Sequence, residues 1–157
     1  MLEKVFDEVY TKFKLNLYRR IFNRFEEREA TLTAVETFCV EVIYALGHPT
    51  INQFAHFVRI SQANAAYKVA SLIRKGYLTK ERNPEDKREY YLAVTGKYLE
   101  YYGISYDYVK VVVERARKRF PPEDIKKLEE MLAVISQELM PEIPLPGEKP
   151  PAERKES

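Results

Sequence analysis

The chain has 157 residues, a formal net charge of +2 and one cysteine. This length is enough for one domain with a hydrophobic core, and a single cysteine excludes an internal disulfide and suits a reducing cytoplasm. So small a net charge does not identify a nucleic-acid binder by itself. No apolar run reaches the ~20 residues that a membrane span needs, and no signal-peptide pattern precedes the first predicted helix.

The first predicted element is a long amphipathic helix over residues 2–28. Apolar side chains recur along it every four positions, at Val5, Val9, Phe13, Leu17, Ile21 and Phe25. At about 1.5 Å per residue such a helix is ~40 Å long, which is more than a core of this size covers. We therefore expect part of its apolar face to contact another subunit.

Two capping boxes follow, each with Thr at the cap and Glu or Gln three residues later. They predict helices over residues 33–46 and 50–58. After a short turn, Ser61 is a good N-cap for a third helix, because its hydroxyl can accept from the free amides of the first turn. Gly76, preceded by Arg and Lys, predicts where this third helix ends.

The helix between Ser61 and Gly76 has two different faces. Ala65, Val69 and Leu72 form an apolar stripe. The opposite face is small and hydrogen-bonding rather than ionic, and Gln and Asn side chains can bond adenine bidentately. An Ala-rich helix packed against protein on both sides would show the same pattern, and this helix alone does not decide between the two.

Residues 77–82 and 88–94 are rich in strand formers, and Asn-Pro-Glu-Asp-Lys between them is turn chemistry. The two runs therefore predict a hairpin. Basic side chains lie at or beside its tip: Arg82, Lys87 and Arg88. A helix with an amide-bearing face followed by a basic-tipped hairpin is typical of a winged helix-turn-helix, with the helix in the major groove and the wing on the backbone or minor groove.

The charge distribution points the same way. Residues 59–88 hold eight Lys and Arg against three acids, whereas residues 121–140 hold two against five. Positive charge concentrated around the hairpin is expected of a phosphate-facing surface. Scattered charges on a solvated surface are the alternative.

This part of the sequence resembles the MarR family of transcriptional regulators, over roughly residues 30–96. The matching segments are Leu72 to Leu78, Arg82 to Arg88 and Leu92 to Gly96. Within them, the family's Asp-x-Arg wing signature appears as Asp86-Lys87-Arg88. Its Leu-Thr-x-x-Gly-like close appears as Leu92-Ala93-Val94-Thr95-Gly96, with two residues inserted between Leu and Thr-Gly. The resemblance implies that Arg88 enters the minor groove and that Asp86 braces it.

The predicted fold class is α+β, mainly α. A winged helix-turn-helix domain over residues 31–95 is flanked by helices at 1–30 and 96–140, which we interpret as one dimerisation domain, as the resemblance also implies. After the wing, one long helix is predicted to about residue 119, where Gly103 and Ser105 interrupt its apolar stripe.

The last predicted helix starts at Pro121-Pro122, and its apolar residues have the 3–4 spacing of a helix–helix seam: Ile125, Leu128, Leu132, Ile135 and Leu139. We expect a homodimer interface built from residues 2–28 and 121–140. Residues 141–157 hold five of the nine prolines and are predicted to be a disordered tail.

Enzyme chemistry is not indicated. No Gly-rich phosphate loop, nucleophile elbow or zinc-ligand spacing occurs, so neither an enzyme nor a cofactor is expected. The two histidines, His48 and His56, would make a poor transition-metal site with Cys39, so metal sensing is disfavoured. Cys39 lies in an apolar run and is expected to be a buried, inert thiol.

Seven of the twelve tyrosines lie between Tyr90 and Tyr108. In the MarR family, small aromatic or lipophilic effectors bind between the wing domain and the dimerisation helices and weaken DNA binding. A candidate ligand pocket would be lined by Tyr90, Tyr98 and Tyr102. The alternative, which we favour, is that these tyrosines pack the junction.

The sequence therefore predicts a cytoplasmic homodimer that binds double-stranded DNA at a pseudo-palindromic operator and regulates transcription. The resemblance implies a repressor released by a small aromatic or lipophilic effector; a winged-helix protein–protein assembly module is the alternative. No membrane partner is expected. The predicted DNA contacts are Ser61, Gln62, Ala63, Asn64, Ala66, Tyr67, Lys68, Arg82, Lys87 and Arg88.

Overall fold

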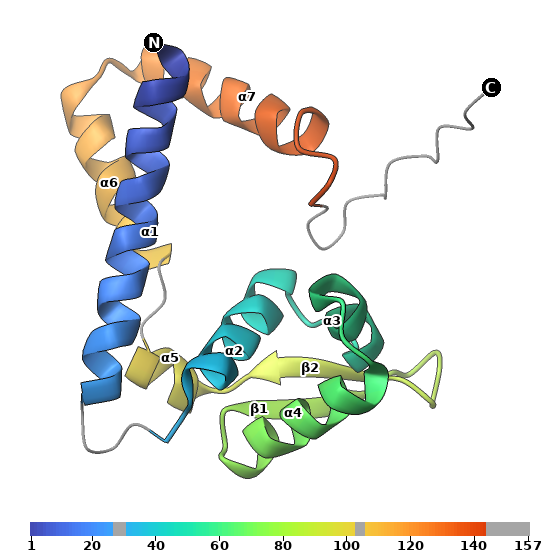
Figure 1. Ribbon diagram of the computed structural model, residues 1–157. Helices are drawn as coiled ribbons and strands as arrows, with labels where there is room; N and C mark the ends of the chain where they lie inside the picture. Colours follow the sequence, from blue (N-terminus) through green and yellow to red (C-terminus); the bar gives the residue numbers. More distant parts are fainter. Residues whose placement is uncertain (27–30, 103–105, 144–157) are drawn as a thin grey trace. The chain divides into compact units, whose positions relative to one another are not determined.

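A computed structural model describes residues 1–26, 31–102 and 106–143 of the chain (Figure 1). The chain divides into two compact units, Met1–Val109 and Lys110–Ser157. Helices predominate in the described part, and its one sheet is a two-stranded antiparallel hairpin. This confirms the predicted α+β, mainly α class. None of the described helices is both long and apolar enough to cross a bilayer.

The first helix, α1 (Leu2–Glu26), is the long amphipathic helix that the sequence predicts. Its apolar face is only partly covered: Ile21 is buried, whereas several large apolar side chains are exposed, namely Leu2, Val5, Phe6, Val9, Tyr10, Leu15, Tyr18 and Phe22. The ring of Phe13 packs edge-on against the ring of Tyr108, with centroids 5.5 Å apart. The helix thus carries more apolar surface than its own unit buries.

Both predicted capping boxes are present, and they start α2 (Ala34–Leu46) and α3 (Ile51–Val58). In the first, Thr33 N donates to Glu36 Oε2 at 2.9 Å and Glu36 N donates to Thr33 Oγ1 at 3.2 Å. In the second, Thr50 and Gln53 exchange the same two bonds at 2.9 and 3.1 Å. Each box satisfies amides that the first helical turn leaves without a partner.

The segment between α2 and α3 joins the sheet. Gly47 and His48 both have positive φ, 58° and 46°, and turn the chain toward the hairpin. There the Pro49 carbonyl accepts from Leu92 N at 2.8 Å, and Thr50 forms an isolated antiparallel bridge with Tyr91. Sequence patterns did not predict this isolated bridge.

The helix-turn-helix follows the predicted pattern. Arg59 ends α3 in the left-handed conformation, and Ser61 caps α4 (Gln62–Arg74) by accepting from Asn64 N at 3.1 Å. Gly76, with φ of +82°, ends α4 as predicted, because Tyr77 N donates to the carbonyl of Leu72 and Gly76 N to that of Ile73.

The hairpin pairs β1 (Leu78–Arg82) with β2 (Tyr90–Val94), in a register that joins Leu78 to Val94 and Arg82 to Tyr90. One core lies between the hairpin and helices α2, α3 and α4. Its fully buried side chains include Val40, Ile43, Phe54, Ala65, Val69, Leu72, Leu78, Leu92 and Tyr98. Cys39 is buried there too, and burial raises the pKa of its thiol, as expected for an inert cysteine.

After the wing, the structure has two helices, α5 (Gly96–Tyr102) and α6 (Tyr106–Arg119). The sequence predicted one long helix over this region. Residues 103–105, where the stripe is interrupted, lie outside the described residues. The hydroxyl of Thr95, just before α5, donates to the Gly76 carbonyl at 2.7 Å and so joins the start of α5 to the end of α4.

The last helix, α7 (Pro122–Glu138), begins with the predicted Pro and two acidic residues in its first turn. Ile125 and Ile135 are half-buried. The other large apolar side chains of this region are exposed: Leu128, Met131, Leu132, Val134, Leu139, Met140 and Ile143. Most of the predicted disordered tail, residues 144–157, lies outside the described residues.

Candidate nucleic-acid interface

The outer face of α4 is open. Ala65, Val69 and Leu72 anchor the helix in the core, as predicted, while the opposite side chains are exposed: Gln62, Ala63, Asn64, Ala66 and Tyr67. Tyr67 has 75% of its surface accessible. The alternative of an α4 covered by protein on both faces therefore does not hold within this chain.

Two side-chain amides lie in the first turn of this face. Across the described residues, neither the Gln62 nor the Asn64 side chain is engaged in a hydrogen bond to protein, so both are available to a ligand. The hydroxyl of Ser61 is occupied as the helix cap. Lys68 is half-buried beside the apolar stripe. The structure thus brings the predicted reading residues together at the N-terminal end of α4.

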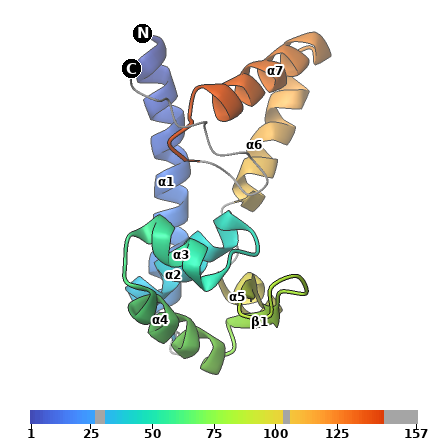
Figure 2. The same ribbon diagram turned by 90° about the vertical axis from the view of Figure 1, so that its right-hand side faces the viewer.

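The wing loop, residues 83–89, projects beyond helices α2–α5 in both views (Figure 1 and Figure 2). Its shape is fixed by its own polar groups. Asn83 Oδ1 accepts from Glu85 N at 2.9 Å, and Asp86 Oδ1 accepts from Arg88 N at 3.0 Å. Asp86 therefore holds the backbone that carries Arg88.

Of the three basic residues predicted for the wing, one is hydrogen-bonded within the loop and two are exposed at its tip. Arg82 Nε donates to the Lys87 carbonyl at 2.8 Å, so this guanidinium closes the loop. Lys87 and Arg88 are exposed at the tip. Next to them, Lys80 Nζ lies 4.8 Å from the ring centroid of Tyr90.

Two tyrosines of the candidate ligand pocket, Tyr90 and Tyr98, lie far apart along the fold. Tyr90 pairs with Arg82 at the wing end of the hairpin, whereas Tyr98 lies in α5, beyond the other end of β2. Tyr98 is fully buried, and its hydroxyl hydrogen-bonds the carboxylate of Glu41 on α2. The side chain of Tyr102 lies outside the described residues. For Tyr98 the structure supports the packing interpretation.

Burial raises the pKa of the Glu41 carboxyl to about 7, from 4.5. A folded-state pKa above the unfolded value means that folding takes up a proton between these pH values, so stability is lost as pH rises through this window. We expect the free energy of unfolding to fall by at most about 3 kcal/mol between pH ~5 and ~7 from this group. Glu41→Gln, which stays neutral, should remove that slope in urea titrations.

The exposed Glu129 on α7 provides the control, because Glu129→Gln removes the same charge from a solvated position. If Glu41→Gln and the wild type show the same pH dependence of unfolding, the raised pKa is wrong.

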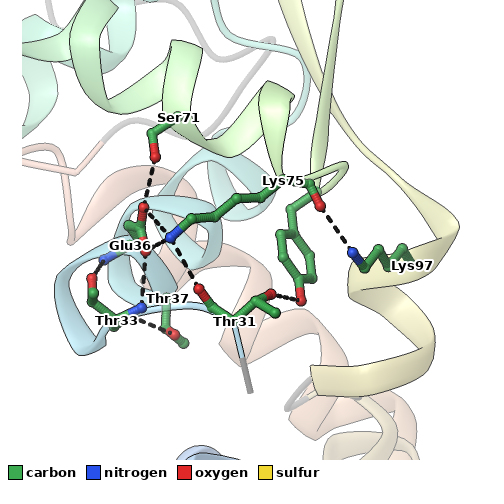
Figure 3. A network of polar contacts seen from close by, with 8 residues as sticks. Thr31, Thr33, Glu36, Thr37, Ser71, Lys75 and Lys97 are labelled. Carbon is green, nitrogen blue, oxygen red and sulfur yellow. Dashed lines mark hydrogen bonds and ion pairs between the residues drawn. The ribbon is translucent and has the colours of Figure 1, made fainter. Parts of the chain in front are cut away.

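Sequence reasoning missed a polar cluster at the C-terminal end of α4 (Figure 3). Glu36 on α2 accepts from Lys75 Nζ at 2.7 and 2.9 Å and from Ser71 Oγ at 2.9 Å. Partial burial alone would raise the pKa of Glu36, but the bonds from Lys75, the Thr33 amide and Ser71 outweigh it and lower that pKa to about 2. The capping box singled out Glu36, but no local pattern points to a partner 39 positions away.

An open helix face preceded by a tight turn and followed by a basic-tipped hairpin defines a winged helix-turn-helix protein. Comparison with known proteins gives the same family as the sequence. Residues 32–90 match the model of the MarR family, which confirms the resemblance seen in the sequence. Across the described residues, no three His, Cys, Asp or Glu side chains are placed to hold a metal ion.

The chain is also similar to individual proteins. The chain is 27% identical over 137 residues to YkoM, an uncharacterised HTH-type transcriptional regulator of Bacillus subtilis (strain 168), covering 82% of this chain and 89% of YkoM. It is similar in fold to the regulator Tm0710 of Thermotoga maritima, with a TM-score of 0.58, 20% identity, and 88% and 96% of the two chains covered. FabT of Streptococcus pneumoniae, crystallised with DNA, gives a TM-score of 0.55, 20% identity, and 88% and 97% coverage. The matched family and YkoM are transcriptional regulators rather than enzymes.

Proposed function

We propose that this chain is a cytoplasmic homodimer that binds a pseudo-palindromic DNA operator, represses transcription and is released by a small aromatic or lipophilic effector. One observation carries the DNA-binding part: the exposed, amide-bearing face of α4 lies in the same domain as an exposed, basic wing. The presence of DNA in the crystals of FabT, a protein of similar fold, supports it.

In this proposal α4 enters the major groove with its N-terminal end first. Gln62 and Asn64 read base edges, because an amide offers a donor and an acceptor that match adenine. Tyr67, one turn further on, adds apolar contact. The small side chains of Ala63 and Ala66 let the backbone approach the groove.

The wing holds the DNA backbone or minor groove. Lys87 and Arg88 carry the charge to the phosphates, while Asp86 and Arg82 keep the loop in shape through the bonds described above. Such contacts position the protein and discriminate weakly between sequences, so the wing supplies affinity and α4 supplies specificity.

Dimerisation is supported by apolar surface on both ends of the chain. Large exposed apolar side chains recur along α1 and along α7, and exposed apolar surface of this extent is typical of an interaction site. A two-fold dimer presents two copies of α4, which fit two half-sites about one helical turn apart, ~10 bp centre to centre.

Selection of bound duplexes from a random pool, followed by footprinting, tests the proposed function. We expect a pseudo-palindrome with half-sites ~10 bp apart, both protected. A single asymmetric half-site bound by one subunit would contradict the dimeric reading of DNA.

Retention on heparin or random duplex distinguishes a DNA-binding regulator from the alternative, a winged-helix module for protein–protein assembly. A DNA-binding regulator is retained and is released as salt rises, because bound phosphates give back their counterions. A winged-helix module that only assembles with protein would pass through at low salt.

A further inference from the structure

The end of α4 opposite the reading residues is fastened to two other segments by side chains (Figure 3). Ser71 lies in the last turn of α4, and Lys75 is the C-cap of that helix. Both side chains donate hydrogen bonds to the Glu36 carboxylate at the start of α2. Lys75 Nζ also donates to the Thr31 carbonyl at 2.9 Å. We call these residues the helix-end cluster: Thr31, Thr33, Glu36, Ser71, Lys75, Tyr77 and Lys97.

The cluster closes through α5. Lys97 Nζ donates to the Lys75 carbonyl at 2.9 Å and lies 4.6 Å from the ring centroid of Tyr77. The hydroxyl of Tyr77 in turn bonds Thr31 Oγ1 at 2.6 Å. The start of α2, the end of α4 and the start of α5 are therefore joined in one ring of contacts.

The second capping box of the chain shows that capping does not require the charge of Glu36. Gln53 completes the box of α3 with the same two bonds and the same geometry, without a carboxylate. The box of α2 has Glu instead, and its charge faces the ammonium of Lys75 on α4. The carboxylate of Glu36 therefore has a role besides capping α2, namely the ion pair with Lys75.

We propose that Glu36, through its ion pair with Lys75, is a positioning residue for DNA recognition that fixes the orientation of α4 on α2. This inference rests on the proposed DNA-binding function. Gln62 and Asn64 are exposed on the first turn of α4, and the ion pair between Lys75 and Glu36 ties the other end of this helix to α2. A change in the tilt or roll of α4 moves both amides relative to the base edges.

Lys75 is not free to act as a phosphate contact. Its ammonium bonds two oxygens of Glu36 and one of Thr31, and the Lys75 and Glu36 side chains are 29% and 13% exposed. Because charge-assisted bonds are short and directional, the pair constrains the helix more tightly than a neutral contact would.

Two variants with opposite changes in charge test the proposal. Glu36→Gln keeps the capping box but removes the ion pair, and Lys75→Met removes the pair from the other side. Electrostatics alone predicts that Glu36→Gln tightens binding to every duplex and that Lys75→Met weakens it. Positioning predicts that both variants lower the ratio of operator to random-duplex affinity, on the order of tenfold, as one impaired base contact does.

Glu100→Gln is the matched control, because it removes one negative charge from an exposed position on α5 and should leave the ratio unchanged. The double variant Glu36→Gln with Lys75→Met should lose no more than either single variant, since both break the same pair. Binding is measured at a temperature at which circular dichroism shows every variant folded.

An unchanged operator-to-random ratio in either folded variant would overturn the positioning role. A wild-type chain that selects no operator would instead overturn the proposed function. The slope of affinity against salt should be the same for Lys75→Met and the wild type, because no phosphate contact is lost; a shallower slope for Lys75→Met also overturns the inference.

Discussion

Replacement of Leu132 and Ile135 by Asp is expected to convert the proposed dimer into monomers and to abolish operator binding. Both residues lie on α7, where Leu132 is 49% exposed and Ile135 is half-buried in the single chain. A partner subunit that covers them would have to bury two unpaired carboxylates in the variant, and a buried charge without a partner costs several kcal/mol. Association would not survive two such changes.

Sedimentation velocity at micromolar concentration, combined with operator titration, measures both effects. Lys127→Asp with Gln137→Asp adds the same two carboxylates to exposed polar positions of α7 and should leave the dimer intact. A wild-type chain that sediments as a monomer at this concentration would contradict the prediction directly. A dimeric Asp variant would place the interface elsewhere.

The second large effect separates base reading from backbone contact. We expect Gln62→Ala or Asn64→Ala to cost ~1–3 kcal/mol on the operator and little on random DNA, with relaxed preference at one base pair per half-site. Arg88→Ala should weaken operator and random DNA together and reduce the log–log salt slope by about one unit for each lost phosphate contact. The reason is that, in the proposed complex, the amides on α4 contact bases, whereas the guanidinium on the wing contacts phosphates or the minor groove.

Titration of each variant against both duplexes at two salt concentrations decides the assignment. None of the three side chains lies on the proposed interface, so sedimentation should show dimers throughout. If the α4 variants keep the operator preference and Arg88→Ala erases it, the roles of helix and wing are reversed.

The parts of the fold that the sequence predicted are those governed by short-range rules. The capping boxes at Thr33 and Thr50, the cap at Ser61 and the left-handed stop at Gly76 each depend on residues within one helical turn. The hairpin was found because turn residues separate two strand-forming runs. Such features can be predicted because they depend only on residues that are close together in the sequence.

What could not be predicted depends on pairs far apart in the chain. Glu36 and Lys75 meet only because α2 and α4 pack together, and Tyr98 reaches Glu41 across 57 positions. The contact between Pro49 and Leu92 joins segments that no pattern relates.

The Pro49–Leu92 contact affects how readily the sheet could aggregate through its strand edges. A strand with an unpaired edge is a template for aggregation. In this hairpin β2 is flanked by β1 on one side and, in part, by Pro49 and Thr50 on the other. The outer edge belongs to β1, whose Lys80, Glu81 and Arg82 are exposed and charged, which discourages edge-to-edge strand addition. These charged side chains therefore protect the outer edge of the sheet from strand addition.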